Sequence, residues 1–189
     1  MTLPLARSTW ECHAFFGLSR CPNCGGGGLE MTEHVLRRTP AGDVSDYTTA
    51  CRRCDQTLRF SFRRADDEPP FPAFGGEQPS ELLDAGQYLE LAEEAAGDVP
   101  DDPADIRPVE PDDLTLEDAF EEIAIAVAAL EETLKFIPPG EFTVARDALW
   151  TEESRDRFDR DPETFQRRRL IAVLGGYREI YAAYARAAR

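Results

Sequence analysis

Alternating hydrophobic and polar residues predict strands in the first third of the chain. Residues 58–63 alternate cleanly and residues 29–35 alternate in part, as expected for strands with one buried face. The inward positions are Leu58, Phe60 and Phe62 in the first of these strands and Leu29, Met31 and Val35 in the other. Residues 39–43 have the composition of a turn, and residues 46–50 suit a third strand. We therefore predict a small three-stranded sheet within residues 20–64.

Hydrophobic residues at helical spacing predict two helices in the middle of the chain. Ser80 has the position of an N-cap for a helix over residues 81–96, Gly97 marks its end, and Gly86 is unfavourable inside it. Further along, Thr115 and Asp118 have the spacing of a capping box. The hydrophobic stripe of this second helix is Phe120, Ile123, Val127, Leu130 and Leu134, and Pro138-Pro139-Gly140 ends it.

Two further helices are predicted near the C-terminus. A short helix over residues 152–160 follows Thr151, and Asp161-Pro162 supplies an N-cap and a first-turn proline for a long last helix. The stripe of that helix is Phe165, Leu170, Val173, Leu174, Tyr177, Ile180, Tyr181 and Tyr184, with its tyrosines expected in the core. Gly175-Gly176 in its middle predicts a kink or a close helix contact.

The net charge of −16 is concentrated in the middle of the chain. The net charge is +3 over residues 1–64, −15 over residues 65–113 and −4 over residues 114–189. We therefore expect an N-terminal segment containing the sheet at 1–64, an acidic Pro/Gly-rich linker at 65–79, and a helical domain at 80–189 with an acidic loop at 97–114. Such charge disfavours general adhesion to nucleic acid or to anionic membranes.

The chain shows neither membrane nor export signals. No stretch has the length of a transmembrane helix, and the N-terminal residues lack the apolar core and cleavage site of a signal peptide. Five cysteines, four of them in a metal-binding pattern, suit a reducing compartment in which Cys12 remains a free thiol. We expect a cytoplasmic protein.

Four cysteines form two C-x2-C pairs, Cys21 with Cys24 and Cys51 with Cys54. Each pair can turn both sulfurs towards one ion, and two pairs complete the tetrahedral all-sulfur shell that structural Zn²⁺ prefers. Such a shell has no open position for water or substrate. The motif therefore predicts how this part of the chain folds more than it predicts a reaction.

The sequences Cys21-Pro22-Asn23-Cys24-Gly25 and Cys51-Arg52-Arg53-Cys54-Asp55 resemble those of the zinc ribbon family, over roughly a quarter of the chain. The resemblance implies four thiolate ligands and a left-handed residue after each pair, which Gly25 and Asp55 tolerate. It implies no single activity. Iron bound as in the rubredoxin family is an alternative, but the two arginines of the second pair match that family less well. The predicted fold class is α+β, a zinc ribbon followed by an antiparallel bundle of three or four helices.

Other residues offer weaker signals. Neither His13 nor His34 lies in a metal-binding spacing, so an enzyme using one of them beside a metal is a third hypothesis only. The arginines of the ribbon suit phosphate, with Tyr47, Phe60 and Phe62 available for stacking; solvent exposure or pairing with the acidic segment is the competing interpretation. These arginines are Arg37, Arg38, Arg52, Arg53, Arg59, Arg63 and Arg64.

Two functions follow as hypotheses. The first is a non-enzymatic protein with a structural zinc ion that binds another protein, for example as an adaptor or as an acidic immunity or antitoxin-like antagonist of a basic toxin. The alternative is a nucleic-acid-binding regulator that uses Arg52, Arg53, Arg59 and Arg63. The sequence does not identify the partner.

Overall fold

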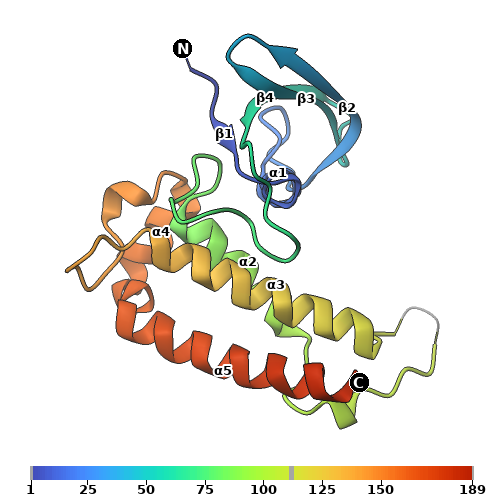
Figure 1. The fold of residues 1–189 in the computed structure, drawn as a ribbon, viewed down its shortest axis with the longest axis vertical. Helices are drawn as coiled ribbons and strands as arrows, with labels where there is room; N and C mark the ends of the chain where they lie inside the picture. Colours follow the sequence, from blue (N-terminus) through green and yellow to red (C-terminus); the bar gives the residue numbers. More distant parts are fainter. Residues whose placement is uncertain (1, 111–112, 189) are drawn as a thin grey trace. The chain divides into compact units, whose positions relative to one another are not determined.

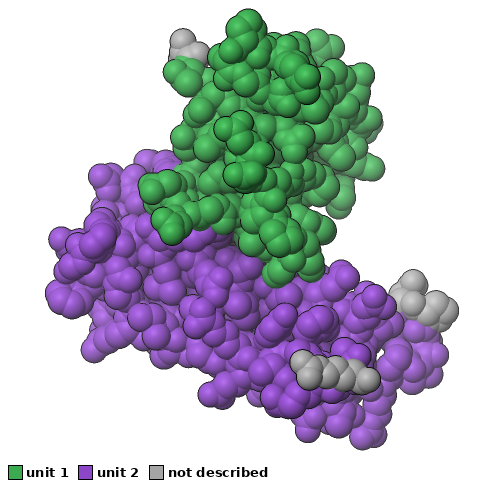
Figure 2. Space-filling view, viewed as in Figure 1, with its two compact units in different colours: residues 1–83 green, residues 84–189 purple. Residues whose placement is uncertain are grey.

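The computed structural model describes residues 2–110 and 113–188 and has the predicted α+β fold class. The chain divides into two compact units, residues 1–83 (unit 1) and residues 84–189 (unit 2), coloured green and purple in Figure 2. The segment expected to be a linker, residues 65–79, thus belongs to unit 1 in this division.

Unit 1 contains a mixed sheet of four strands and one helix (Figure 1). Its elements are β1 (Leu5–Ala6), α1 (Thr9–Leu18), β2 (Leu29–Thr39), β3 (Gly42–Cys51) and β4 (Thr57–Arg64). The strand order is β1-β4-β3-β2, with β1 parallel to β4 and the other pairs antiparallel. The three predicted strands are confirmed, but the number of strands was wrong because two-residue β1 is too short to show any alternation.

Helix α1 supplies the hydrophobic core of unit 1. Its Phe16 ring lies 5.1 Å from Tyr47 and 5.5 Å from Phe60, and its Phe15 ring lies 5.6 Å from Phe62. The predicted inward face of β4 is thereby confirmed. Helix α1 itself was not predicted, because its hydrophobic residues form no single stripe; it begins at Ser8, whose hydroxyl accepts a hydrogen bond from the Glu11 backbone N–H.

A bulge reverses the alternation of β2. The pairing with β3 shifts between Met31 and Glu33, which inserts one extra residue into β2. Leu29 is buried, whereas Met31 and Val35 are 40% and 48% exposed, and Val35 lies on the opposite face from Leu29. The expectation that Leu29, Met31 and Val35 share one buried face is therefore wrong. Beyond the bulge, His34 and Leu36 lie on the α1 side of the sheet instead, with His34 paired with Tyr47.

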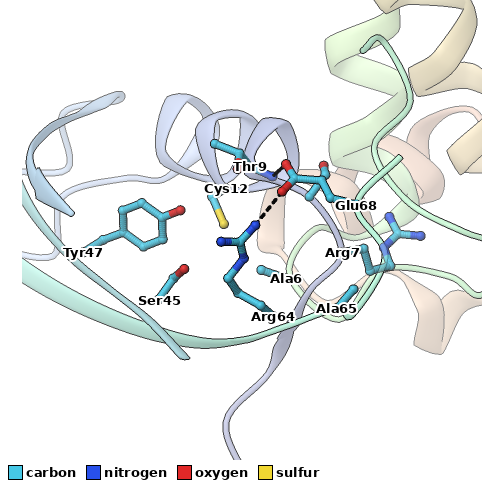
Figure 3. A pocket seen from close by; sticks show the side chains of 10 residues that line it. Ala6, Arg7, Thr9, Cys12, Ser45, Tyr47, Arg64, Ala65 and Glu68 are labelled. Carbon is cyan, nitrogen blue, oxygen red and sulfur yellow. Dashed lines mark hydrogen bonds and ion pairs between the residues drawn. The ribbon is translucent and has the colours of Figure 1, made fainter. Parts of the chain in front are cut away.

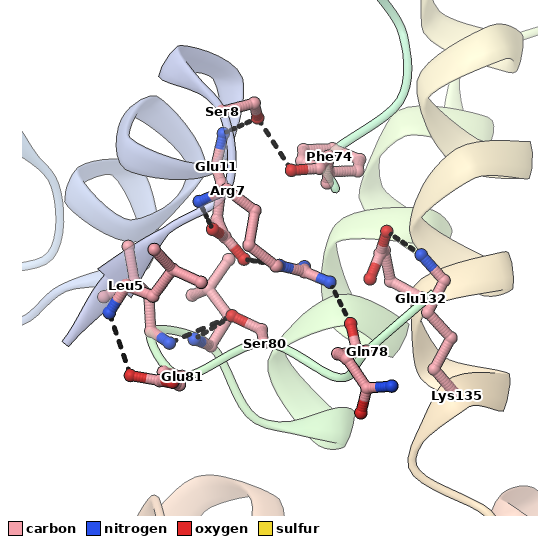
Figure 4. A network of polar contacts seen from close by, with 12 residues as sticks. Leu5, Arg7, Ser8, Glu11, Phe74, Gln78, Ser80, Glu81, Glu132 and Lys135 are labelled. Carbon is pink, nitrogen blue, oxygen red and sulfur yellow. Dashed lines mark hydrogen bonds and ion pairs between the residues drawn. The ribbon is translucent and has the colours of Figure 1, made fainter. Parts of the chain in front are cut away.

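A buried ion pair at the start of α1 and two hydrogen bonds beside it connect this helix to the segment that follows the sheet (Figure 4). The Arg7 guanidinium lies 2.6 Å from Glu11 Oε1, with side-chain exposures of 5% and 0%, and Arg7 Nη1 donates to Gln78 O at 2.5 Å. Ser8 Oγ donates to Phe74 O at 2.8 Å. Buried charged groups need hydrogen-bond partners. The bonds to the carbonyl oxygens of Phe74 and Gln78 therefore fix residues 74–78 against the start of α1.

Unit 2 is a set of packed helices. Its elements are α2 (Ala85–Gly97), α3 (Leu116–Lys135), α4 (Glu152–Arg160) and α5 (Arg167–Ala187), with short 3-10 helices at Pro103–Asp105, Arg146–Ala148 and Pro162–Phe165. Helix α3 packs against both α2 and α5. Its capping box, formed by Thr115 and Asp118, is confirmed, and so is the short helix α4 behind Thr151.

Helix α2 begins four residues later than the sequence suggested. Ser80 Oγ accepts hydrogen bonds from the backbone N–H groups of Leu82 and Leu83, in a turn before the helix. The N-cap is Asp84, which forms a capping box with Gln87. Ser80 and Asp84 are both good caps in isolation, and tertiary contacts to Asp84 decide between them.

The last helix also begins later than predicted. Residues 162–165 form a separate 3-10 helix, and α5 starts at Arg167. The backbone of Gln166 pairs with that of Thr143, and Val144 N donates to Phe165 O, so an extended residue separates the two helices. Tyr184 is buried as expected. Gly175-Gly176 was expected to mark a kink or a close helix contact, and the second alternative is wrong, because no described residue outside the surrounding helix backbone lies within 4 Å of a methyl group placed at either glycine.

Candidate metal centre

Two backbone turns position the four cysteines. In the first turn, Gly25 N donates to Cys21 O at 2.8 Å, and in the second, Asp55 N donates to Cys51 O at 2.9 Å. Gly25 and Asp55 have φ values of 67° and 56°, so the left-handed residue expected after each pair is present in both turns. The first turn precedes β2, and the second joins β3 to β4. The antiparallel strands therefore bring the two turns to the same end of the sheet.

The four sulfurs form one compact group. All four Sγ atoms lie within 4.8 Å of one another, with Cys21 Sγ 3.7 Å from Cys54 Sγ and Cys24 Sγ 3.6 Å from Cys51 Sγ. Sulfurs placed tetrahedrally about 2.3 Å from a zinc ion are about 3.8 Å apart. The group is thus consistent with a zinc-binding site, and the sulfurs need only small movements to surround an ion.

Neighbouring groups donate hydrogen bonds to three of the four sulfurs. Backbone N–H groups point at two sulfurs, from Gly26 to Cys24 Sγ and from Arg53 to Cys51 Sγ, each at 3.4 Å. Asn23 Nδ2 donates to Cys54 Sγ at 3.5 Å. The hydrogen bonds from Asn23 and from the Gln56 backbone lower the pKa of Cys54 to about 6. The hydrogen bond from the Gly26 backbone lowers the pKa of Cys24, but its contacts with the other sulfurs and its burial outweigh this effect and raise that pKa to about 11. Sequence reasoning missed the role of Asn23, although its place inside the first C-x2-C pair was a usable signal.

The second turn also packs against the first. A methyl group placed at Gly26 would lie 3.1 Å from Arg53 Cδ and 3.3 Å from Cys24 Sγ. The stem of Arg53 therefore lies over the backbone beside the first cysteine pair, while the residue as a whole is exposed. Gly26 leaves the space that this arrangement needs.

Neither histidine joins the sulfur group. Among the described residues, the four cysteines are the one set of three or more potential ligands whose atoms approach so closely. His34 stacks on Tyr47 at 4.3 Å, and its Nε2 lies 3.0 Å from Ser45 Oγ. Burial, Arg64 and His13 lower the pKa of His34. His13 is exposed and lies 5.9 Å from the ring of Trp10.

A small polar pocket lies between α1 and the sheet (Figure 3). It has room for about one water molecule. Cys12 is buried here, and burial raises the pKa of its thiol to about 12. Among the other lining residues, Arg64 donates to Glu68 at 2.6 Å, and Glu68 accepts from Thr9 N at 2.5 Å. A thiol with such a pKa is a poor nucleophile, so its surroundings fit a packing role.

The structure separates the ribbon arginines into two groups. Acidic partners hold four of them: Arg37 with Asp46, Arg38 with Asp43, Arg63 with Glu81 and Arg64 with Glu68. Two of these acids, Glu68 and Glu81, come from the acidic segment after the sheet. Such pairing was one of the interpretations of the sequence. Arg52, Arg53 and Arg59 are exposed. Tyr47 and Phe62 are buried, so the expectation that they are available for base stacking is wrong.

Comparison of the chain with models of protein families, with curated proteins and with solved structures gives no match. None of the helices formed by the described residues is long and apolar enough to cross a membrane. The class of protein is therefore defined by the fold and the site alone: an α+β protein with a four-cysteine group consistent with a zinc-binding site in its sheet unit, and a second unit of helices.

Proposed function

We propose that this chain is a non-enzymatic, cytoplasmic protein that uses a structural zinc ion to hold unit 1 and binds another protein through its acidic helical unit. The observation that carries the proposal is the closeness of the four sulfurs of Cys21, Cys24, Cys51 and Cys54, which lie within 4.8 Å of one another, as the ligands of one zinc ion would. A closed shell of four thiolates supplies folding free energy and offers no position for a substrate.

The charge of unit 2 supports a basic protein partner. Residues 84–189 carry 26 acidic and 12 basic side chains, a net charge of −14. On α2 and α3, four acidic side chains lie near one another: Glu94, Asp118, Glu121 and Glu122. Burial and the other three carboxylates raise the pKa of Glu122. A cationic partner would relieve this repulsion and would be steered towards it, as expected for an immunity or antitoxin-like antagonist.

Capture of partners from the native host tests the proposal. The zinc-loaded chain is used as bait beside a variant with Glu94, Glu121 and Glu122 changed to Gln. A matched control carries Glu152→Gln, Glu153→Gln and Asp156→Asn on α4, which changes the net charge equally. We expect a basic protein to bind the wild type and the control, and to be lost from the first variant. Failure to recover any specific protein would count against this function.

Binding of nucleic acid is the second candidate, and one observation favours it. Arg52 and Arg53 are exposed on the turn that holds the second cysteine pair, and Arg59 is exposed on β4. Arg63, by contrast, donates to Leu3 O and lies 3.4 Å from Glu81. The test is binding of a single-stranded oligonucleotide by the full chain as salt is varied. Binding at low salt that disappears on Arg52→Ala with Arg53→Ala would support this function.

A further inference from the structure

Strand β2 forms an open edge of the sheet. It is the last strand in the order β1-β4-β3-β2, and among the described residues its one strand partner is β3. An edge strand leaves half of its backbone N–H and C=O groups without a strand partner. Every residue from Glu30 to Arg38 is exposed, including Val35 at 48% and Leu36 at 50%. This is a long edge with hydrophobic side chains at its centre.

The charges along β2 are divided by sign. Glu30 and Glu33 lie in its first half, and Arg37 and Arg38 lie near its end. Charged side chains on an edge strand commonly prevent pairing with other chains. Here, however, an antiparallel copy of the same strand would place the acidic half of one strand beside the basic half of the other.

In one register, the side chains that face each other across the two strands are matched on both faces of the sheet. Beyond the bulge, Glu33, Val35 and Arg37 share one face of the sheet, and His34 and Leu36 share the other. A two-fold axis through Val35 places Glu33 opposite Arg37 of the copy, Val35 opposite Val35, and His34 opposite Leu36. Residues directly opposite in an antiparallel pair lie on one face and interact. Opposite charges then flank a hydrophobic centre on one face, and Leu36 covers the imidazole on the other.

Neighbouring registers lack this match. Moving the axis to His34 places Glu33 opposite Val35 and Arg37 opposite Met31 of the copy. Moving it to Leu36 places Arg37 opposite Val35 and Arg38 opposite His34. In both registers a charged side chain faces Val35, and the pairing of Glu33 with Arg37 is lost, which makes them less favourable.

We propose that β2 pairs with β2 of a second copy of this chain, antiparallel and centred on Val35, to make one continuous sheet of eight strands. Unit 1 carries 9 arginines and 11 acidic residues, a net charge of only −2, so two copies can approach through this unit despite the charge of the whole chain. The contact is short because the bulge at Met31–Glu33 limits it on one side. The dimer is therefore weak and its population depends on concentration.

Sedimentation of the full zinc-loaded chain over a range of concentrations tests the pairing. We expect the mass to rise from 21.1 kDa towards twice that value. Glu33→Arg alone, or Arg37→Glu alone, places like charges opposite each other twice in each dimer and should weaken it by about tenfold or more. The double variant restores opposite charges, and an equimolar mixture of the two single variants should form a mixed dimer.

Controls keep the test independent of folding. Glu30→Arg makes the same charge change as Glu33→Arg but faces Pro40 of the copy, beyond the end of the strand pair, so it should leave the dimer intact. Circular dichroism and the zinc content of each variant report on unit 1. A chain that remains monomeric at about 1 mM would overturn the proposal. The remaining candidate to pair with β2 would then be an extended segment of another protein. A dimer that the two charge reversals do not weaken would also overturn it.

Discussion

Gly86 should be the position in α2 where a single methyl group is most damaging. Its ideal Cβ would lie 2.3 Å from Ser154 Oγ and 2.5 Å from Ser154 Cβ on α4. Ser154 Oγ in turn donates to the buried Asp84 carboxylate at 2.7 Å. Overpacking costs about 1–3 kcal/mol, and loss of a hydrogen bond to a charged group about 1.5–3 kcal/mol. After an offset of up to about 1 kcal/mol for helix propensity, Gly86→Ala should destabilise unit 2 by about 1.5–6 kcal/mol.

Tryptophan fluorescence during urea unfolding can measure this loss in unit 2 alone. The chain has two tryptophans, Trp10 in unit 1 and Trp150 in unit 2. Trp10→Phe leaves Trp150 as the reporter, with its ring 6.1 Å from Phe136 and its backbone N–H on Asp84 Oδ2. In this background Gly86→Ala should lower the urea midpoint while leaving the slope unchanged.

Two matched variants decide whether the clash is the cause. Gly176→Ala makes the same change inside α5, where nothing lies within 4 Å of the added methyl group, and should stabilise by up to about 1 kcal/mol. In a Ser154→Gly background, Gly86→Ala should lose most of its effect, which a double-mutant cycle measures. Equal stability of Gly86→Ala and its parent, or an unchanged effect in the Ser154→Gly background, would refute the reasoning.

Further predictions concern the removal of zinc, the reactivity of the Cys12 thiol and the N-cap Asp84. Removal of zinc by a chelator should unfold unit 1 and leave the helical signal of unit 2, since structural zinc supplies on the order of 10 kcal/mol in small modules; circular dichroism and zinc content check this. Because the pKa of Cys12 is raised to about 12, about one in ten thousand of its thiols is ionised at pH 8. Cys12 should therefore resist alkylation until unit 1 unfolds, which mass spectrometry can measure. Asp84→Ala should destabilise unit 2 by more than about 3 kcal/mol in urea unfolding. The reason is that Asp84 Oδ2 accepts hydrogen bonds from the backbone N–H groups of Trp150 and Thr151. Asp84→Asn should cost less.

Local chemistry made much of the fold predictable. The capping box of Thr115 and Asp118 closes within four residues, and the left-handed residues Gly25 and Asp55 follow from the turn that a C-x2-C pair requires. These features depend on short stretches of chain. The starts of α2 and α5 were not predictable in this way. Asp84 precedes α2 and accepts a hydrogen bond from the backbone of Thr151, and Gln166 precedes α5 and pairs with the backbone of Thr143, so both starts depend on residues far along the chain.

By itself, the sequence determined the two C-x2-C pairs, the strands between and after them, and the strongly acidic helical part, because spacing, alternation and charge are local properties. Only the tertiary structure decided which face each residue of β2 presents, which of two good caps begins α2, and which arginines already have acidic partners. The physical reason is that each of these depends on a contact between distant segments. One bulged residue between Met31 and Glu33 moved Val35 to the opposite face, where it lies between Glu33 and Arg37 at the centre of the proposed pairing.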